Sequence, residues 1–199
     1  PKPGETILGN AFSVQAGGKG ANQAVAAARL GSNVKFCCKV GSDGYGESAL
    51  TSYRNEGIDD NYFLVDDSLP SGVALILVDR NGENQIAVAS GANGHISPTD
   101  IEAIESFSKF DVVLTQLEIP LVAVESICRR AHDENALMIL NPAPAQRLST
   151  DVLSNVDIIT PNETEAQILT GVRVETEDDA FRAGKILCDK GVKPVIITL

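Results

Sequence analysis

The feature that constrains the fold most is an alternation of short apolar runs with amphipathic segments, which begins near residue 98. The apolar runs predict strands, and the segments between them predict helices. We expect strands at 111–117, 136–140, 156–160 and 195–199, and helices from residue 98 and at 121–133, 162–170 and 176–190. Short apolar strands separated by helices are typical of a parallel sheet covered on both faces. The alternation therefore predicts a doubly wound α/β fold, in which ligands lie beyond the carboxyl ends of the strands.

One segment departs from this rhythm. Two strand-like runs, 72–79 and 83–90, flank Asn81-Gly82, a dipeptide that favours the tight turn of a β-hairpin. The opening run, 5–14, is strand-like as well. These antiparallel pieces predict a small separate sheet that acts as a lid or as a dimer surface.

Charge and composition exclude several classes of protein. The net charge is −11, from 27 acidic and 16 basic residues, which disfavours binding to nucleic acid or to anionic membranes. No apolar run approaches the ~20 residues that span a bilayer. The sequence has two histidines, and so few disfavour a zinc site or a Ser-His-Asp triad. The four cysteines, Cys37, Cys38, Cys128 and Cys188, match no zinc spacing, and we expect reduced thiols in a cytoplasmic protein.

Both ends of the sequence look cut. The chain starts at Pro1 without an initiator methionine, and its only methionine is Met138. It ends on an apolar run that closes with Leu199. We therefore expect a piece of a longer protein.

A glycine-rich stretch at 16–31, AGGKGANQAVAAARLG, leads into the first predicted helix. It lacks the spacing of a P-loop and of the G-x-G-x-x-G fingerprint, so the common nucleotide sites are poor matches. Gly18 and Gly20 allow close approach of a ligand, Lys19 brings a cation, and Asn22 offers a donor and an acceptor at the helix start. The pattern is compatible with a site for the hydroxyl groups of a polyol or with a structural glycine turn.

Polar side chains also follow the predicted strands. Glu118 comes directly after the strand at 111–117 and is either a ligand for hydroxyl groups or an acid that stabilises a helix start. Asn162 and Glu165 lie three residues apart at the start of another helix. An amide and a carboxylate there suit a hydrated Mg²⁺ with phosphates, or else a simple N-cap with acidic first-turn residues.

Several motifs occur together and in order. They are PGETILG at 3–9, GGKGANQA at 17–24 with glycines at 31 and 41, QLE at 116–118, NPAPA at 141–145, and TPNETEAQILTG at 160–171. By these motifs the whole chain resembles the ribokinase-like (PfkB) carbohydrate kinases. The resemblance implies a three-layer α/β/α fold with a mostly parallel central sheet and a small β-sheet lid. It implies one kinase domain over residues 1–199, incomplete at both ends, with lid segments at about 5–15 and 72–90.

The resemblance also implies roles for individual residues. Gly18, Lys19, Gly20, Asn22 and Glu118 match positions that bind the sugar. Asn162 matches a position that binds ATP, and Glu165 one that binds Mg²⁺ through water. The implied reaction transfers the γ-phosphoryl group of ATP to the terminal hydroxyl of D-ribose, with Mg²⁺ and, in the complete protein, a monovalent cation such as K⁺. The lid implies a homodimer.

Two parts of the family pattern do not occur in this sequence. The glycine-rich turn that ends in the aspartate base is absent, and we expect it after Leu199, so no catalytic residue is assigned within residues 1–199. The first strand of the family, which brings an aspartate to the sugar, is missing too. A polypeptide limited to these residues should transfer no phosphate. The alternatives are a fructokinase or nucleoside kinase of the same family, or a non-catalytic sugar-binding protein.

Overall fold

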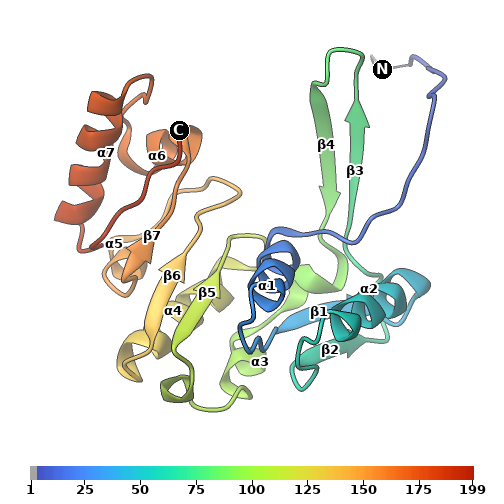
Figure 1. The fold of residues 1–199 in the computed structure, drawn as a ribbon, viewed down its shortest axis with the longest axis horizontal. Coiled ribbons are helices and arrows are strands. Elements are labelled where there is room, and N and C mark those ends of the chain that lie inside the picture. Colours follow the sequence, from blue (N-terminus) through green and yellow to red (C-terminus); the bar gives the residue numbers. More distant parts are fainter. Residues whose placement is uncertain (1–3) are drawn as a thin grey trace.

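A computed structural model describes residues 4–199, so Pro3, the first residue of the PGETILG motif, lies outside the described residues. The chain forms α-helices, short 3-10 helices (η) and β-strands (Figure 1). In chain order these are α1 (Lys19–Arg29), β1 (Cys38–Gly41), α2 (Gly44–Asn55), β2 (Phe63–Asp66), β3 (Val73–Val78), β4 (Asn84–Ala89), η1 (Gly91–His95), α3 (Pro98–Glu102), η2 (Phe107–Lys109), β5 (Val112–Thr115), α4 (Leu121–Asp133), β6 (Leu137–Leu140), α5 (Thr150–Leu153), β7 (Ile158–Ile159), α6 (Glu163–Thr170) and α7 (Glu177–Asp189).

A three-stranded parallel sheet, in the order β5-β6-β7, forms the centre of the C-terminal half. Met138, Leu140 and Ile159 are fully buried in its core, where α4 packs with Val124 and Cys128. Burial of each large apolar side chain stabilises the fold by about 1.5–3 kcal/mol. The α/β fold class and the parallel pairing predicted from the sequence are confirmed.

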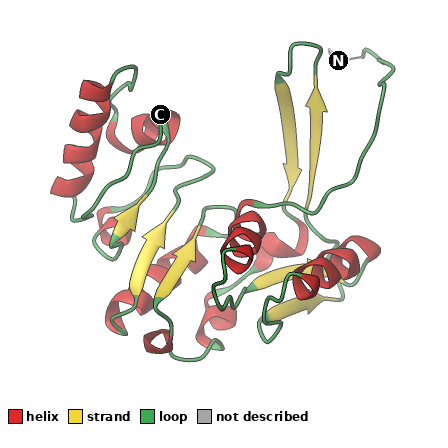
Figure 2. Ribbon diagram, in the orientation of Figure 1, coloured by secondary structure: helices red, strands yellow, loops and turns green. Residues whose placement is uncertain are grey.

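A second parallel pair, β1-β2, forms a separate two-stranded sheet that packs against α1 and α2. Three rings, of Phe36, Tyr53 and Phe63, meet edge to face at centroid distances of 5.4–6.5 Å and fill this core. Within residues 4–199, β1 and β5 are not hydrogen-bonded to each other (Figure 2). The predicted central sheet is therefore present as two ladders, and the face of β5 that carries Val112 and Leu114 is exposed rather than covered.

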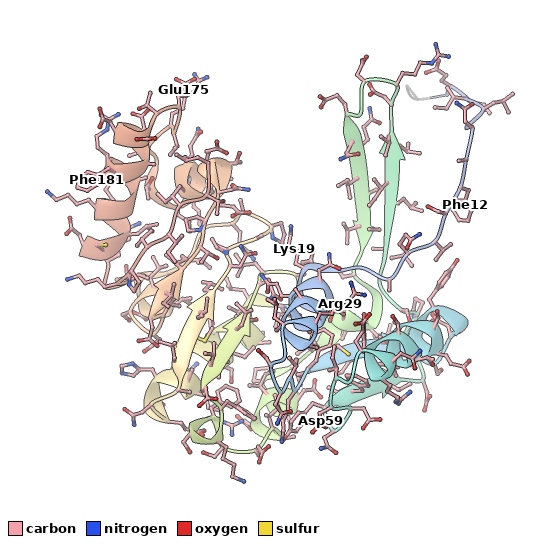
Figure 3. All side chains as sticks on the ribbon, in the orientation of Figure 1. Phe12, Lys19, Arg29, Asp59, Glu175 and Phe181 are labelled. Carbon is pink, nitrogen blue, oxygen red and sulfur yellow. The ribbon has the colours of Figure 1, made fainter. Side chains whose placement is uncertain are left out.

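The predicted hairpin is confirmed. β3 and β4 pair antiparallel from Val73↔Ala89 to Val78↔Asn84, and the hairpin projects away from the two layers (Figure 1). The prediction of a strand at 5–14 was wrong, because residues 5–18 form no strand. A strand needs a neighbouring strand for its N–H and C=O groups, and no ladder pairs with residues 6–17 in the described part of the chain. Its apolar side chains are exposed, to 98% at Leu8 and to 88% at Phe12. Figure 3 labels Phe12.

The predicted strand at 195–199 is only partly present. Two isolated parallel bridges, Ile159↔Val195 and Asn162↔Thr198, hold it beside β7 without a continuous ladder. Helix α2 was not predicted, although Asp43 caps it by accepting a hydrogen bond from the Gly46 N–H at 2.9 Å. Within residues 4–199 no helix combines the length and apolar character that crossing a bilayer requires.

Candidate functional site

A groove of about 2300 Å³ lies where the predicted sugar-binding residues meet. The start of α1, the residues that follow β5 and the hairpin all contribute to its lining. It continues between β1 and β5, whose facing edges are unpaired in the described part of the chain. The groove therefore joins the carboxyl end of β5 to the glycine-rich turn.

The glycine-rich turn and Glu118 are in direct contact. Gly18 has a φ of 100°, which side-chain-bearing residues rarely adopt, and it carries no side chain that could cap α1. Glu118 provides the cap instead: its Oε2 accepts a hydrogen bond from the Lys19 N–H at 2.6 Å. A carboxylate at a helix N-terminus is favoured by the free N–H groups and the helix dipole. Two predicted site residues, distant in sequence, thus form one polar centre.

The other predicted residues of this stretch surround that centre. A Cβ atom on Gly20 would lie 2.8 Å from Gln116 Oε1, so a side chain there would displace Gln116, which donates a hydrogen bond to Gln23. The side chains of Lys19 and Asn22 are exposed (Figure 3 labels Lys19), and the Lys19 ammonium group forms no salt bridge within residues 4–199. Both side chains are free to contact a ligand. The sequence analysis gave no role to the Gln116–Gln23 pair.

Asn162 and Glu165 form a capping box at the start of α6. The Glu165 N–H donates to Asn162 Oδ1 at 2.8 Å, and the Asn162 N–H donates to Glu165 Oε2 at 2.9 Å. Glu165 is only 7% exposed. These bonds form the N-cap that the sequence analysis gave as one of two alternatives. They also fix the Glu165 carboxylate near the carboxyl end of β7. In the described residues no three acidic, histidine or cysteine side chains converge as metal ligands.

Asn141 links the ends of the three strands. Its N–H donates to Thr115 O at 3.0 Å, and its Nδ2 donates to Thr160 O at 3.2 Å. The Leu117 N–H, next to Glu118, donates to Ala143 O at 2.8 Å. The Glu118 centre and the Asn162–Glu165 pair therefore lie along one sheet edge, joined through the NPAPA loop, for which the sequence analysis assigned no residue role.

A second polar cluster fixes the hairpin foot, which we define as residues 69–72 and 89–92. Asp43 accepts hydrogen bonds from the Ser71 N–H at 2.8 Å and from Ser71 Oγ at 2.7 Å. Ser71 Oγ in turn accepts from the Gly41 N–H at 3.0 Å. The bonds from Ser71, with that from the Gly46 N–H, lower the pKa of the Asp43 carboxyl to about 2. This cluster was missed by the sequence analysis.

The lowered pKa predicts an acid-sensitive hairpin foot. A carboxyl group whose pKa is depressed on folding contributes stability above its unfolded pKa, and that contribution is lost as the pH falls toward the folded pKa. Between a pH of 3.8 and about 2, we expect the thermal midpoint of the wild type to fall more steeply than that of Asp43→Asn, which cannot titrate. The measurement is circular dichroism melting across this range. Parallel pH profiles would contradict the assignment.

The two buried cysteines offer no reactive nucleophile. All four thiols are free, as expected, and Cys38 and Cys128 are buried. Burial raises the pKa of each of these two thiols to about 12, so the thiolate form is scarce at neutral pH. The chemistry of the groove rests on its amide, ammonium and carboxylate groups.

Comparison with known proteins gives concordant matches. Residues 1–199 match the family described as pfkB family carbohydrate kinase. A ribokinase of Haemophilus influenzae is 47% identical over 199 residues, which are 100% of this chain and 65% of that protein. A deoxyribokinase of Salmonella typhi is 40% identical over 201 residues, covering 100% of this chain and 66% of that protein. The solved structure of Arabidopsis thaliana ribokinase complexed with ribose and ATP has a TM-score of 0.87 and 30% identity, covering 99% of this chain and 65% of that one.

Proposed function

Because this chain belongs to the pfkB family of carbohydrate kinases, we propose that it carries the acceptor-binding part of an ATP-dependent kinase that phosphorylates D-ribose at its terminal hydroxyl. The observation that carries the proposal is the polar centre formed by Glu118 and the first N–H of α1. Relatives described as ribokinases, at 47% and 41% identity, support the choice of sugar. The chain spans 65% of the first of these relatives, so the activity is proposed for the full-length protein that contains residues 1–199.

The site residues bind and orient the sugar. The Glu118 carboxylate accepts hydrogen bonds from sugar hydroxyls, the N–H groups at the start of α1 donate to hydroxyl oxygens, and the Asn22 amide does both. Hydroxyl groups are donors and acceptors at once, so this mixed set suits a sugar better than a phosphate. Fixing the acceptor in one orientation lowers the entropic cost of in-line phosphoryl transfer. We expect the general base, the aspartate of the family's glycine-rich turn, in sequence that follows Leu199.

A coupled assay of ADP formation tests this function. The full-length protein is given D-ribose, 2-deoxyribose, fructose and adenosine with ATP and Mg²⁺, and kcat/KM is measured for each acceptor. Ribose should give the highest value. A higher value for 2-deoxyribose, fructose or adenosine would keep the family and overturn the ribose assignment. Ribose binding without ADP formation would favour a non-catalytic sugar-binding protein.

We propose that the nucleotide phosphates bind near Asn162 and Glu165. Mg²⁺ neutralises phosphate charge in phosphoryl transfer and keeps most of its water ligands. The single buried carboxylate of Glu165 fits contact through water, and the lack of a three-ligand cluster in the described residues fits an ion held mainly by phosphates. K⁺, also implied by the family, has no assigned ligand among residues 4–199.

The nucleotide side has its own prediction. Glu165→Gln removes the charge but keeps an oxygen that can accept from the Asn162 N–H, so the helix cap should survive. We expect the concentration of Mg²⁺ and ATP needed for half-maximal rate to rise about tenfold, with KM for ribose unchanged. Glu163→Gln, an exposed acid of the same helix turn, is the matched control. Equal effects of the two variants would remove Glu165 from the site.

We further propose that the hairpin, with the segment at about 5–15, is a lid that pairs with the lid of a second copy. Both sides of the hairpin are apolar and exposed, to 67% at Leu75 and 68% at Val88. Exposed apolar surface of this kind marks an interface. Sedimentation of the full-length protein should show a dimer, and Leu75→Asp should give monomers; a monomeric wild type would refute the pairing. The free thiols suit a cytoplasmic protein.

A further inference from the structure

The hairpin foot is built of backbone segments in close contact. The Ala92 N–H donates to Pro70 O at 2.8 Å, across the two sides of the foot. A Cβ atom on Gly91 would lie 2.4 Å from Pro70 O, and one on Gly72 would lie 2.6 Å from Ser90 O. A side chain at either position would require the backbone to move, so the two sides of the foot are closely packed. The end of β4 is therefore held firmly where the chain enters η1.

Helix η1 is also fixed at its far end. Lys39 Nζ donates to His95 O at 3.0 Å and forms an ion pair with Asp100 Oδ2 at 2.7 Å. Asp100 belongs to the capping box of α3, so β1, η1 and α3 are joined through one ammonium group. Asn93 lies between the two fixed ends of η1. Its side chain is thus presented from a defined position.

Asn93 connects this fixed segment to the polar centre. Its Nδ2 donates a half-buried hydrogen bond to Glu118 O at 3.0 Å. The side chain of Glu118 in turn accepts a hydrogen bond from the Lys19 N–H through its Oε2. The first N–H of a helix has no partner within the helix, so the contact with Glu118 is its only protein acceptor among the described residues.

We propose that Asn93 is a positioning residue that ties the foot of the lid hairpin to Glu118 and so holds the carboxylate at the start of α1. The consequence for ribose binding rests on the function proposed above; the consequence for the Lys19 N–H does not. Without the Asn93 bond, the turn at Glu118 loses a restraint on its backbone, and the carboxylate samples positions away from Lys19. Sugar affinity falls while the phosphate side is unchanged.

The test compares Asn93→Leu, which is close to asparagine in shape and lacks the donor, with Asn155→Leu. Asn155 makes the same kind of bond, from Nδ2 to Asp151 O at 2.9 Å, away from the groove. Hydrogen exchange of the peptide at 17–24 reports on the Lys19 N–H without any ligand. We expect this amide to exchange about tenfold faster in Asn93→Leu and at the wild-type rate in Asn155→Leu. An unchanged rate in Asn93→Leu would overturn the proposal.

Kinetics on the full-length protein give the second readout. KM for ribose should rise about tenfold in Asn93→Leu, with kcat and KM for ATP within about twofold of the wild type. In a Glu118→Ala background, Asn93→Leu should change neither the exchange rate nor KM further; additive effects would mean that Asn93 acts only on general stability. If Asn93→Leu does not fold, Asn93→Ser replaces it, because the serine side chain is too short for its hydroxyl to reach Glu118 O. A wild type that phosphorylates no sugar would end the proposed function, while the exchange measurement would still decide the role of Asn93.

Discussion

We expect Glu118→Ala in the full-length protein to lower kcat/KM for ribose about 100-fold and to leave KM for ATP within about twofold of the wild-type value. The substitution removes the carboxylate that contacts the start of α1, at 2.6 Å from the Lys19 N. A hydrogen bond to a charged group contributes about 1.5–3 kcal/mol, and each 1.4 kcal/mol corresponds to a factor of ten. Steady-state kinetics with ribose and ATP varied separately provide the measurement.

Two further variants make this result specific. Glu118→Gln keeps an acceptor for the Lys19 N–H but loses the charge, so it should fall between the wild type and Glu118→Ala, with a loss of about tenfold. Glu102→Ala removes an exposed acid of α3 and should leave both KM values unchanged. Equal increases in KM for ribose and ATP in Glu118→Ala would show that the residue supports the fold as a whole rather than the acceptor.

We expect Gly46→Ala to destabilise the protein by more than about 3 kcal/mol. A Cβ atom at this position would lie 2.1 Å from Gly41 O and 2.8 Å from Ser71 Oγ. The clash with the backbone of β1 cannot be relieved by rotating a side chain, so α2 must shift away from β1 and the Asp43–Ser71 bonds must break. Equilibrium unfolding in urea measures the loss, together with the loss of helical circular dichroism.

Gly44→Ala is the matched control, two residues earlier in the same helix. A Cβ atom on Gly44 meets nothing within 4 Å, and alanine is the better helix former. We expect a change between zero and a stabilisation of about 1 kcal/mol. If the stability of Gly46→Ala lay within about 0.5 kcal/mol of the wild type, the close packing of α2 against β1 would be refuted.

Local signals in the sequence were sufficient for much of the fold. The bounds of α4 agree with the predicted 121–133, and α6 and α7 begin after the caps Asn162 and Thr176. The hairpin followed from Asn81-Gly82 between two apolar runs. Caps, turns and periodicity act over a few residues, so one sequence is enough to read them.

The misses depend on contacts between distant segments. The run at 5–14 has the composition of a strand but joins no sheet in the described residues, because a neighbouring strand would have to come from a distant segment. Helix α2 has glycines in its first turn, which disfavour a helix, yet Gly46 is required by the approach of Gly41 O. In both cases tertiary contacts outweigh local propensity.

The residues of the candidate site likewise fall into a group that the sequence predicted and a group that it did not. Gly18, Lys19 and Glu118 were singled out from a glycine turn and from the position after a strand, and they lie together. Asn93, Asn141 and the Asp43–Ser71 pair were not predicted, because their partners are backbone groups of remote segments. A hydrogen bond from a side chain to a backbone group of a distant segment produces no motif of fixed spacing in the sequence.

The most direct test of the central claim is a titration of the ¹⁵N-labelled full-length protein with D-ribose, without nucleotide, followed by amide NMR. If the acceptor binds at the start of α1, the largest shifts should fall on the amides of Gly18, Lys19 and Gly20 and saturate with one dissociation constant. Glu118→Ala should weaken that constant about 100-fold. Shifts confined to the capping box of Asn162 and Glu165, or no saturable shift at all, would contradict the assignment of this turn as the sugar site.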